Sequence, residues 1–167
     1  ILAKTVLFAQ GGGSKSAYAL AAALGHTIIP PVPSLFSFNV PDSRLAGLAG
    51  ISVQDVQVNL LVRKEARDQN KILFSANGPI LITHWGLSGP VILRLSAWGA
   101  RSLAEAGYQA ELHINWSGNE TPDENLRSLL AFKAKSPQLL VSSRHPSNRI
   151  PLRLWISLVN QAGISTD

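Results

Sequence analysis

The residues best suited to chemistry lie in one short loop, residues 83–89, which reads THWGLSG. It holds His84 beside Trp85 and ends on Ser88 and Gly89. A histidine side chain can exchange a proton near neutral pH, and an indole ring can stack on an aromatic ligand. We therefore take these four residues as candidate ligand contacts. The structural alternatives are a histidine that locks the turn by a hydrogen bond and a tryptophan that fills the core.

Two regular elements are predicted to position this loop. The residues before it, 80–82, are aliphatic and typical of a strand. The residues after it form an apolar stripe with helical spacing, beginning at Pro90 and ending at Gly107. Ser88 or Gly89 would then cap the helix, whose free N–H groups attract anions or polarised oxygens.

A second candidate site lies near the start of the chain. Residues 5–9 predict a buried strand, and a helix is predicted from Ser14 to Leu24, ending at Gly25. Such a strand–turn–helix unit can cradle a phosphate, but this turn lacks the spacing of the known dinucleotide motifs, so a purely structural turn is the alternative. The candidate cofactor-binding residues here are Gly11, Gly12, Gly13 and Ser14.

The middle of the chain predicts a small antiparallel structure. Prolines at 30, 31 and 33 indicate a domain boundary. Strands are expected at residues 35–40, 51–62, 72–75, 80–83 and 108–116. Asn77-Gly78 predicts a hairpin turn between two of them, and the charged residues 63–70 predict a solvated connection. Five short strands with few parallel crossovers favour a small barrel or sandwich.

The end of the chain predicts a small helical subdomain. Thr121 opens a capping box with a proline at the first helical position, and a short helix is expected to reach Phe132. Residues 138–142 are expected to be extended, and a second helix is expected over residues 151–161. The fold class is therefore α+β. Its expected parts are residues 1–29, a barrel domain over 30–120 with an embedded helix, and a helical subdomain over 121–167.

The composition excludes several classes of protein. The 167 residues include no cysteine, which rules out disulfide and thiol chemistry and fits a cytoplasmic protein. No apolar run approaches the ~20 residues of a membrane span, so we expect no membrane partner.

None of the four histidines has metal-ligand spacing, and no residue can be assigned a catalytic role. Because the chain contains no methionine and begins at Ile1, we expect it to be a piece of a longer protein.

Basic residues dominate the last quarter of the chain. The net charge is +5, and there is no Asp or Glu from Asn125 to Thr166. Such a segment can bind nucleic acid or a phosphate-bearing ligand. It can equally be a solvated face, because no aromatic–basic interleaving or nucleic-acid motif accompanies it. The basic residues are Arg127, Lys133, Lys135, Arg144, Arg149 and Arg153.

Several segments, in order, resemble one family. Residues 78–90, ending THWGLSGP, resemble the signature of the YhiN/BaiN-type flavoproteins, the aminoacetone-oxidase family. The glycine turn and helix of residues 6–26, the proline-rich IPPVPSLF of residues 29–36 and the helical residues 151–163 resemble that family's corresponding segments. The N-terminal dinucleotide motif and the C-terminal segment of the family are absent from this sequence.

The resemblance implies that this chain is a remnant βα unit of an FAD-binding domain followed by an inserted reductase- or elongation-factor-like β-barrel with a small helical subdomain. It also implies that the THWGLSGP loop faces the flavin or substrate. FAD, with NAD(P)H as a candidate reductant, would serve the parent protein, and we expect this chain alone to be inactive and not to retain FAD. The implied partners are the missing FAD-binding domain and a small-molecule substrate.

Two other interpretations remain open. The basic segment and the barrel-like strand count are also compatible with a binding module for nucleic acid or a protein partner, although the flavoprotein interpretation requires no nucleic acid. Alternatively, the chain is an interface for self-association, since apolar surface would be exposed where the missing domain packs.

Overall fold

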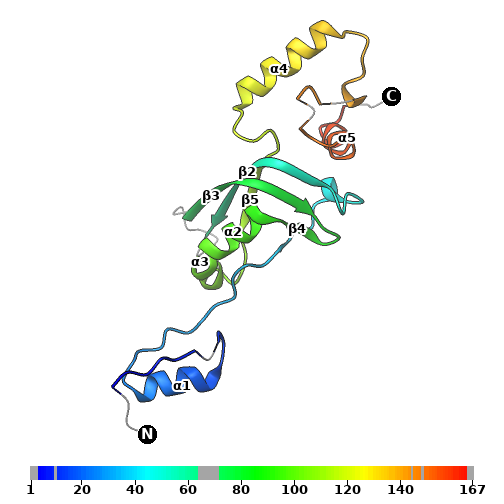
Figure 1. Ribbon diagram of the computed structural model, residues 1–167. Coiled ribbons are helices and arrows are strands. Elements are labelled where there is room, and N and C mark those ends of the chain that lie inside the picture. Colours follow the sequence, from blue (N-terminus) through cyan, green and yellow to red (C-terminus); the bar gives the residue numbers. More distant parts are fainter. Residues whose placement is uncertain (1–3, 10, 64–71, 144, 148, 165–167) are drawn as a thin grey trace. The chain divides into compact units, whose positions relative to one another are not determined.

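The computed structural model describes residues 4–9, 11–63, 72–143, 145–147 and 149–164. The expected connection at residues 63–70 lies outside these ranges except for Arg63. Contacts divide the chain into two units, residues 1–32 and residues 33–167, and each is described by itself (Figure 1).

The first unit contains one helix, α1 (Lys15–Ala23), as its sequence predicts. The Ser14 hydroxyl caps it by accepting a hydrogen bond from the Ala17 amide at 3.5 Å. The expected buried strand at residues 5–9 was wrong, because these residues are exposed and form no strand. A strand requires a hydrogen-bonded neighbour, and no described strand lies in this unit. None of the α1 side chains is buried.

The second unit is built on an antiparallel sheet that curls into a half-barrel (Figure 1). Its strands are β1 (Phe38–Asn39), β2 (Ser52–Val62), β3 (Ile72–Ile82), β4 (Gly86–Ser88) and β5 (Glu111–Asn115). They lie in the order β1-β4-β3-β2-β5, and each described pair is antiparallel. The predicted α+β class, with a small barrel and a helical subdomain, is confirmed.

The predicted hairpin at Asn77-Gly78 was wrong. Both residues lie inside the long strand β3, where Gly78 is opposite Val56 of β2. Between Val53 and Val56, strand β2 bulges, so that two of its residues lie opposite Pro79 alone. Proline has no N–H to donate, and it is tolerated inside β3 because the ladder is interrupted at this point.

The helix predicted to start at Pro90 is present but is interrupted at Gly99. It forms α2 (Pro90–Trp98) and α3 (Ala100–Glu105). A β-carbon on Gly99 would lie 3.1 Å from Cδ2 of Leu60, so glycine allows this turn to approach β2 closely. Helix α2 packs chiefly against β3.

Two 3₁₀ turns and two α-helices remain, and the last three of these four make up the helical subdomain. The four are the 3₁₀ turn η1 (Ser43–Leu45), α4 (Pro122–Lys135), the 3₁₀ turn η2 (Val141–Ser143) and α5 (Leu152–Gln161). The capping box at Thr121 is present, as predicted, and α4 runs three residues past Phe132. The expected extended conformation at residues 138–142 was wrong, because η2 begins within that segment.

Helix α5 is anchored on the segment around η1, whereas α4 is not buried at any residue. The Arg153 side chain donates to the Gly47 carbonyl oxygen at 2.6 Å, and the Ser157 hydroxyl donates to the Arg44 carbonyl oxygen at 2.7 Å. Leu154 is fully buried. Helix α5 therefore forms part of the core, and α4 is held mainly through its neighbours in sequence.

The core lies between the inner face of the half-barrel, α2 and α5. Its largest fully buried side chains include Leu60, Ile80, Ile82, Leu87, Ile92, Leu95, Leu103 and Leu154. None of the helices in the described ranges is both long enough and apolar enough to cross a membrane.

Candidate functional site

The loop between β3 and β4 is fixed by its backbone. The Thr83 amide donates to the Gly86 carbonyl oxygen at 2.8 Å, and the Val40 amide donates to the Trp85 carbonyl oxygen at 3.0 Å. His84 and Trp85 lie at the tip of this turn with exposed side chains, and the Trp85 side chain is 68% exposed. Their ring centroids are 6.3 Å apart at a tilted angle. The exposure argues against a core-filling role for Trp85.

This loop and the segment around residues 39–46 enclose a groove of about 340 Å³. His84 and Trp85 line one side of it, and Asn39 and Asp42 line the other. Small-molecule sites typically occupy ~300–1,000 Å³, so this groove can accommodate one ring system but not a whole dinucleotide. We call it the His84 groove.

Thr83 adds a polar atom that sequence reasoning missed. Its hydroxyl oxygen Oγ1 is buried and has no hydrogen-bond partner among the described residues, while Thr83 lines the His84 groove. A buried hydroxyl without a partner carries a desolvation cost that a ligand can remove by hydrogen bonding to it. The only available signal was its position next to His84, because its burial depends on the tertiary structure.

The charge at the groove comes from a tight ion pair. Asp42 and Arg44 are joined by a salt bridge of 2.6 Å between Oδ2 and Nη2. The hydrogen bond from the Arg44 side chain lowers the pKa of the Asp42 carboxyl group. Asp42 is therefore ionised at neutral pH and can only accept hydrogen bonds, so it favours a ligand donor such as N–H or O–H.

The structure places Ser88 and Gly89 away from the lining of the His84 groove. The Ser88 hydroxyl accepts a hydrogen bond from the Ser37 hydroxyl at 2.7 Å. Gly89 is the N-cap of α2 with φ 97°, and a β-carbon there would lie 2.9 Å from the Leu81 amide nitrogen. Ser88 and Gly89 thus join β4 to neighbouring elements, whereas the adjacent residues His84 and Trp85 line the groove. Ligand contact by these four residues stays a prediction.

The glycine turn lies in the other unit. Gly11 and Gly13 have φ values of 72° and 82°, a left-handed conformation that glycine adopts without strain. Gly12 has open space around it, and the Ser14 hydroxyl lies 2.7 Å from the Ser16 hydroxyl. Cofactor binding by Gly11, Gly12, Gly13 and Ser14 stays a prediction.

Two of the basic residues near the end of the chain are engaged in internal contacts. Arg149 lies 3.9 Å from the Asp55 carboxylate and 3.8 Å from the Glu120 carboxylate, and Arg153 donates to the backbone at Gly47. Arg144 lies outside the described residues. The exposed basic groups of the described subdomain that remain are Arg127, Lys133 and Lys135, all on α4.

His145 is a buried histidine in the segment between η2 and α5. It is 6% exposed, its Nδ1 lies 2.7 Å from the Ser147 hydroxyl, and its ring meets Trp155 edge-on at 4.8 Å. Burial lowers the pKa of the imidazole, against the opposing influence of the Glu120 carboxylate. The described residues contain no group of three or more His, Asp or Glu side chains that could hold a metal ion.

Comparisons with known proteins give the family. Residues 32–167 match the family model described as the HI0933-like protein barrel and H2TH domain. The chain is 27% identical over 154 residues to a 3-dehydro-bile acid delta(4,6)-reductase of Clostridium scindens, covering 90% of the chain and 36% of the relative. It is 29% identical over 126 residues to a ribosomal RNA dihydrouridine synthase of Haemophilus influenzae, covering 71% of the chain and 29% of the relative.

The chain thus spans about a third of the length of these curated relatives. The family match includes the half-barrel, the His84 groove and the helical subdomain. It confirms the family resemblance predicted from the THWGLSGP segment and its neighbours. This chain belongs to the HI0933-like family and carries its barrel and H2TH domain.

Proposed function

We propose that this chain is the barrel insert of an FAD-dependent oxidoreductase, in which it covers the flavin and shapes the substrate pocket. The observation that carries the proposal is the His84 groove, where a buried hydroxyl with no partner among the described residues and an exposed indole lie in the segment that resembles the family signature. The names of the two relatives support the reaction class. One is a reductase, and dihydrouridine is uridine with two added hydrogens.

The residues of the groove fit a flavin or substrate ring. The Trp85 side chain offers an exposed aromatic face for stacking, and the Thr83 hydroxyl can bond to a ring oxygen or nitrogen. His84 can donate a hydrogen bond or a proton at the rim. The flavin would supply the redox chemistry, and these residues would bind and orient the reacting partner.

A separate FAD-binding domain would hold the rest of the cofactor. The first unit supports this partner, because α1 buries no side chain and several large apolar residues of the unit are exposed. Those residues are Val6, Leu7, Phe8, Leu20, Leu24 and Ile29. The same surface could drive self-association of the isolated chain, which light scattering would detect.

The first experiment is an FAD titration followed by flavin fluorescence, on this chain and on a longer protein in which it is joined to an FAD-binding domain. We expect the longer protein to bind FAD and the chain alone to bind weakly or not at all. His84→Ala in the longer protein is then expected to lower turnover per bound flavin. Unchanged turnover would contradict the assignment of His84, and the absence of FAD binding by the longer protein would overturn the proposal itself.

A second candidate function is binding of RNA by the helical subdomain. The observation that favours it is the run of exposed cations on α4, Arg127, Lys133 and Lys135, together with the Haemophilus relative named for ribosomal RNA. Phosphate-directed binding weakens steeply with salt. A gel shift with ribosomal RNA fragments at two salt concentrations tests it, and Lys133→Gln and Lys135→Gln should then weaken binding equally. A salt-independent result or no shift would contradict it.

A further inference from the structure

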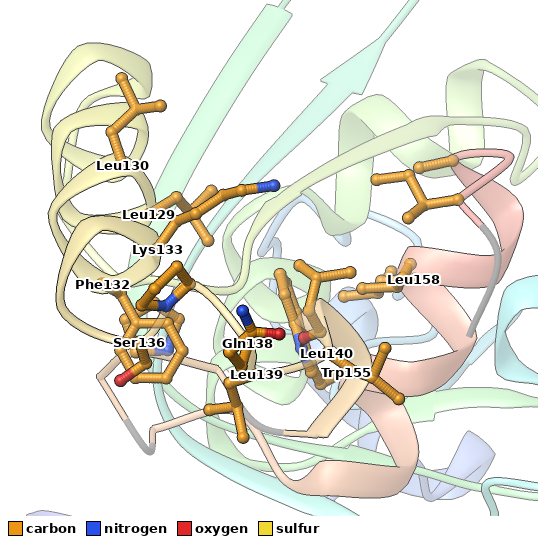
Figure 2. A pocket seen from close by; sticks show the side chains of 16 residues that line it. Leu129, Leu130, Phe132, Lys133, Ser136, Gln138, Leu139, Leu140, Trp155 and Leu158 are labelled. Carbon is orange, nitrogen blue, oxygen red and sulfur yellow. Dashed lines mark hydrogen bonds between the residues drawn. The ribbon is translucent and has the colours of Figure 1, made fainter. Parts of the chain in front are cut away.

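A second cavity lies in the helical subdomain, and it shares no lining residue with the His84 groove. It has a volume of about 530 Å³ and lies between α4, the segment containing η2, and α5 (Figure 2). We call it the α4–α5 cavity. Its volume falls in the range of small-molecule sites, ~300–1,000 Å³.

Most of the wall of this cavity is apolar. Helix α4 supplies Leu129 and Phe132, and α5 supplies Trp155 and Leu158. The Trp155 indole N–H already donates to the Val141 carbonyl oxygen at 2.7 Å, so this ring presents its apolar surface to the cavity. The wall therefore favours an aliphatic or alicyclic body over a polar ligand.

The polar groups of the wall lie on one stretch, the end of α4 and the residues after it. They are Lys133, Ser136 and Gln138. Figure 2 shows the Lys133 side chain extending from α4 with its ammonium group directed toward the space between α4 and α5. Ala162 and Ile164, which also line the cavity, carry no ionisable group. The cavity thus combines a mostly apolar wall with one cationic side chain.

The positive charge of Lys133 is not neutralised locally. No salt bridge joins it to a carboxylate among the described residues, and the sequence has no Asp or Glu from Asn125 to Thr166. On its own helix, Glu124 lies nine residues away, which is roughly 14 Å along the axis. An anion beside Lys133 would therefore meet an ammonium group that no carboxylate of the described residues neutralises.

We propose that the α4–α5 cavity is a binding site for an amphipathic carboxylate, a small molecule with an aliphatic body and one anionic end. The carboxylate would pair with the Lys133 ammonium group. The aliphatic body would lie against Phe132, Trp155 and the α5 side chains. This site is separate from the proposed flavin groove and does not depend on it.

Decanoate and 1-decanol are matched probes, because they share an alkyl chain and differ in charge. We expect this chain to bind decanoate at pH 7.5 with one-to-one stoichiometry in titration calorimetry, below the micelle concentration, and to bind 1-decanol more weakly. Lys133→Gln should weaken decanoate roughly 5-fold and leave 1-decanol unchanged. Lys135→Gln, which removes an equal charge from an exposed residue outside the cavity, should leave both unchanged.

A second matched pair of variants tests the apolar wall of the cavity. Phe132→Ala should weaken both probes about 10-fold, whereas Leu126→Ala, on the same helix but outside the cavity and 54% exposed, should weaken neither. Circular dichroism checks that each variant keeps its helix content. The proposal is overturned if decanoate does not bind saturably, if both probes bind equally well, or if Lys133→Gln and Lys135→Gln have the same effect.

Discussion

The backbone of Gly86 lies so close to that of Phe38 that a β-carbon on Gly86 would overlap the Phe38 carbonyl oxygen and lie 2.6 Å from the Val40 amide nitrogen. Gly86 pairs with Asn39 across β1 and β4. The same short strand β1 leads into the segment that forms the far wall of the His84 groove. Gly86, the first of the two glycines in the THWGLSGP segment, therefore allows the two walls of the groove to approach each other.

Gly86→Ala is expected to destabilise the second unit by at least ~2 kcal/mol, because the new methyl group would meet backbone atoms that cannot rotate away. Its φ of 155° is also unfavourable for alanine. Chemical denaturation measures the loss. Gly12→Ala is the control, since open space surrounds Gly12. Equal stability of the two variants would contradict the close approach of β1 and β4.

Thr83→Val is expected to leave stability unchanged or to raise it by about 1 kcal/mol, because it removes a buried hydroxyl that has no partner. In the longer protein the same change should weaken binding of the flavin or substrate. Thr83→Ser keeps the hydroxyl and should retain binding. A valine variant that binds as tightly as the threonine protein would show that this hydroxyl has no ligand.

Trp85→Ala and Trp98→Ala compare two exposed tryptophans, 68% and 56% exposed respectively. Trp98 lies at the end of α2 with Arg94 near its ring and does not line the His84 groove. Both changes should cost little stability. We expect only Trp85→Ala to reduce turnover per bound flavin in the longer protein, because only Trp85 can stack on a ligand there. Equal turnover in the two variants would remove Trp85 from the site.

Because the His145 side chain is buried, we expect the folded protein to lose stability at acid pH. Burial lowers the pKa of His145 in the folded state, so the unfolded chain binds the proton more tightly. Above the ordinary histidine pKa of about 6.5, burial of the neutral His145 ring does not reduce the free energy of unfolding. As the pH falls below that value, the free energy of unfolding declines. His145→Gln should flatten this part of the unfolding free energy between pH 7 and pH 5. The exposed His113→Gln is the control, and an unchanged pH profile in His145→Gln would contradict the argument.

The elements that sequence patterns located correctly depend on residues close together in the chain. The capping box of α4 needs only Thr121 and Glu124, three residues apart, and β2 spans Ser52–Val62, close to the strand predicted over residues 51–62. The His84 loop was also found from sequence, because its glycines and the following proline are local signals. The resemblance to the family was also recognised chiefly from this segment, and the family match over residues 32–167 confirms it.

The features that sequence reasoning missed depend on residues far apart in the chain. Asn77-Gly78 is a strong turn signal, but pairing of β3 with the bulged strand β2 overrides it. Arg153 and Ser157 bond to backbone atoms 106 and 113 residues away. Distant segments decide which side chains they cover when they pack. They therefore decide whether a basic side chain stays exposed, whether a histidine is buried and whether a threonine hydroxyl lacks a hydrogen-bond partner. Local sequence thus determined the elements and the loop, and the tertiary structure decided which side chains line each cavity.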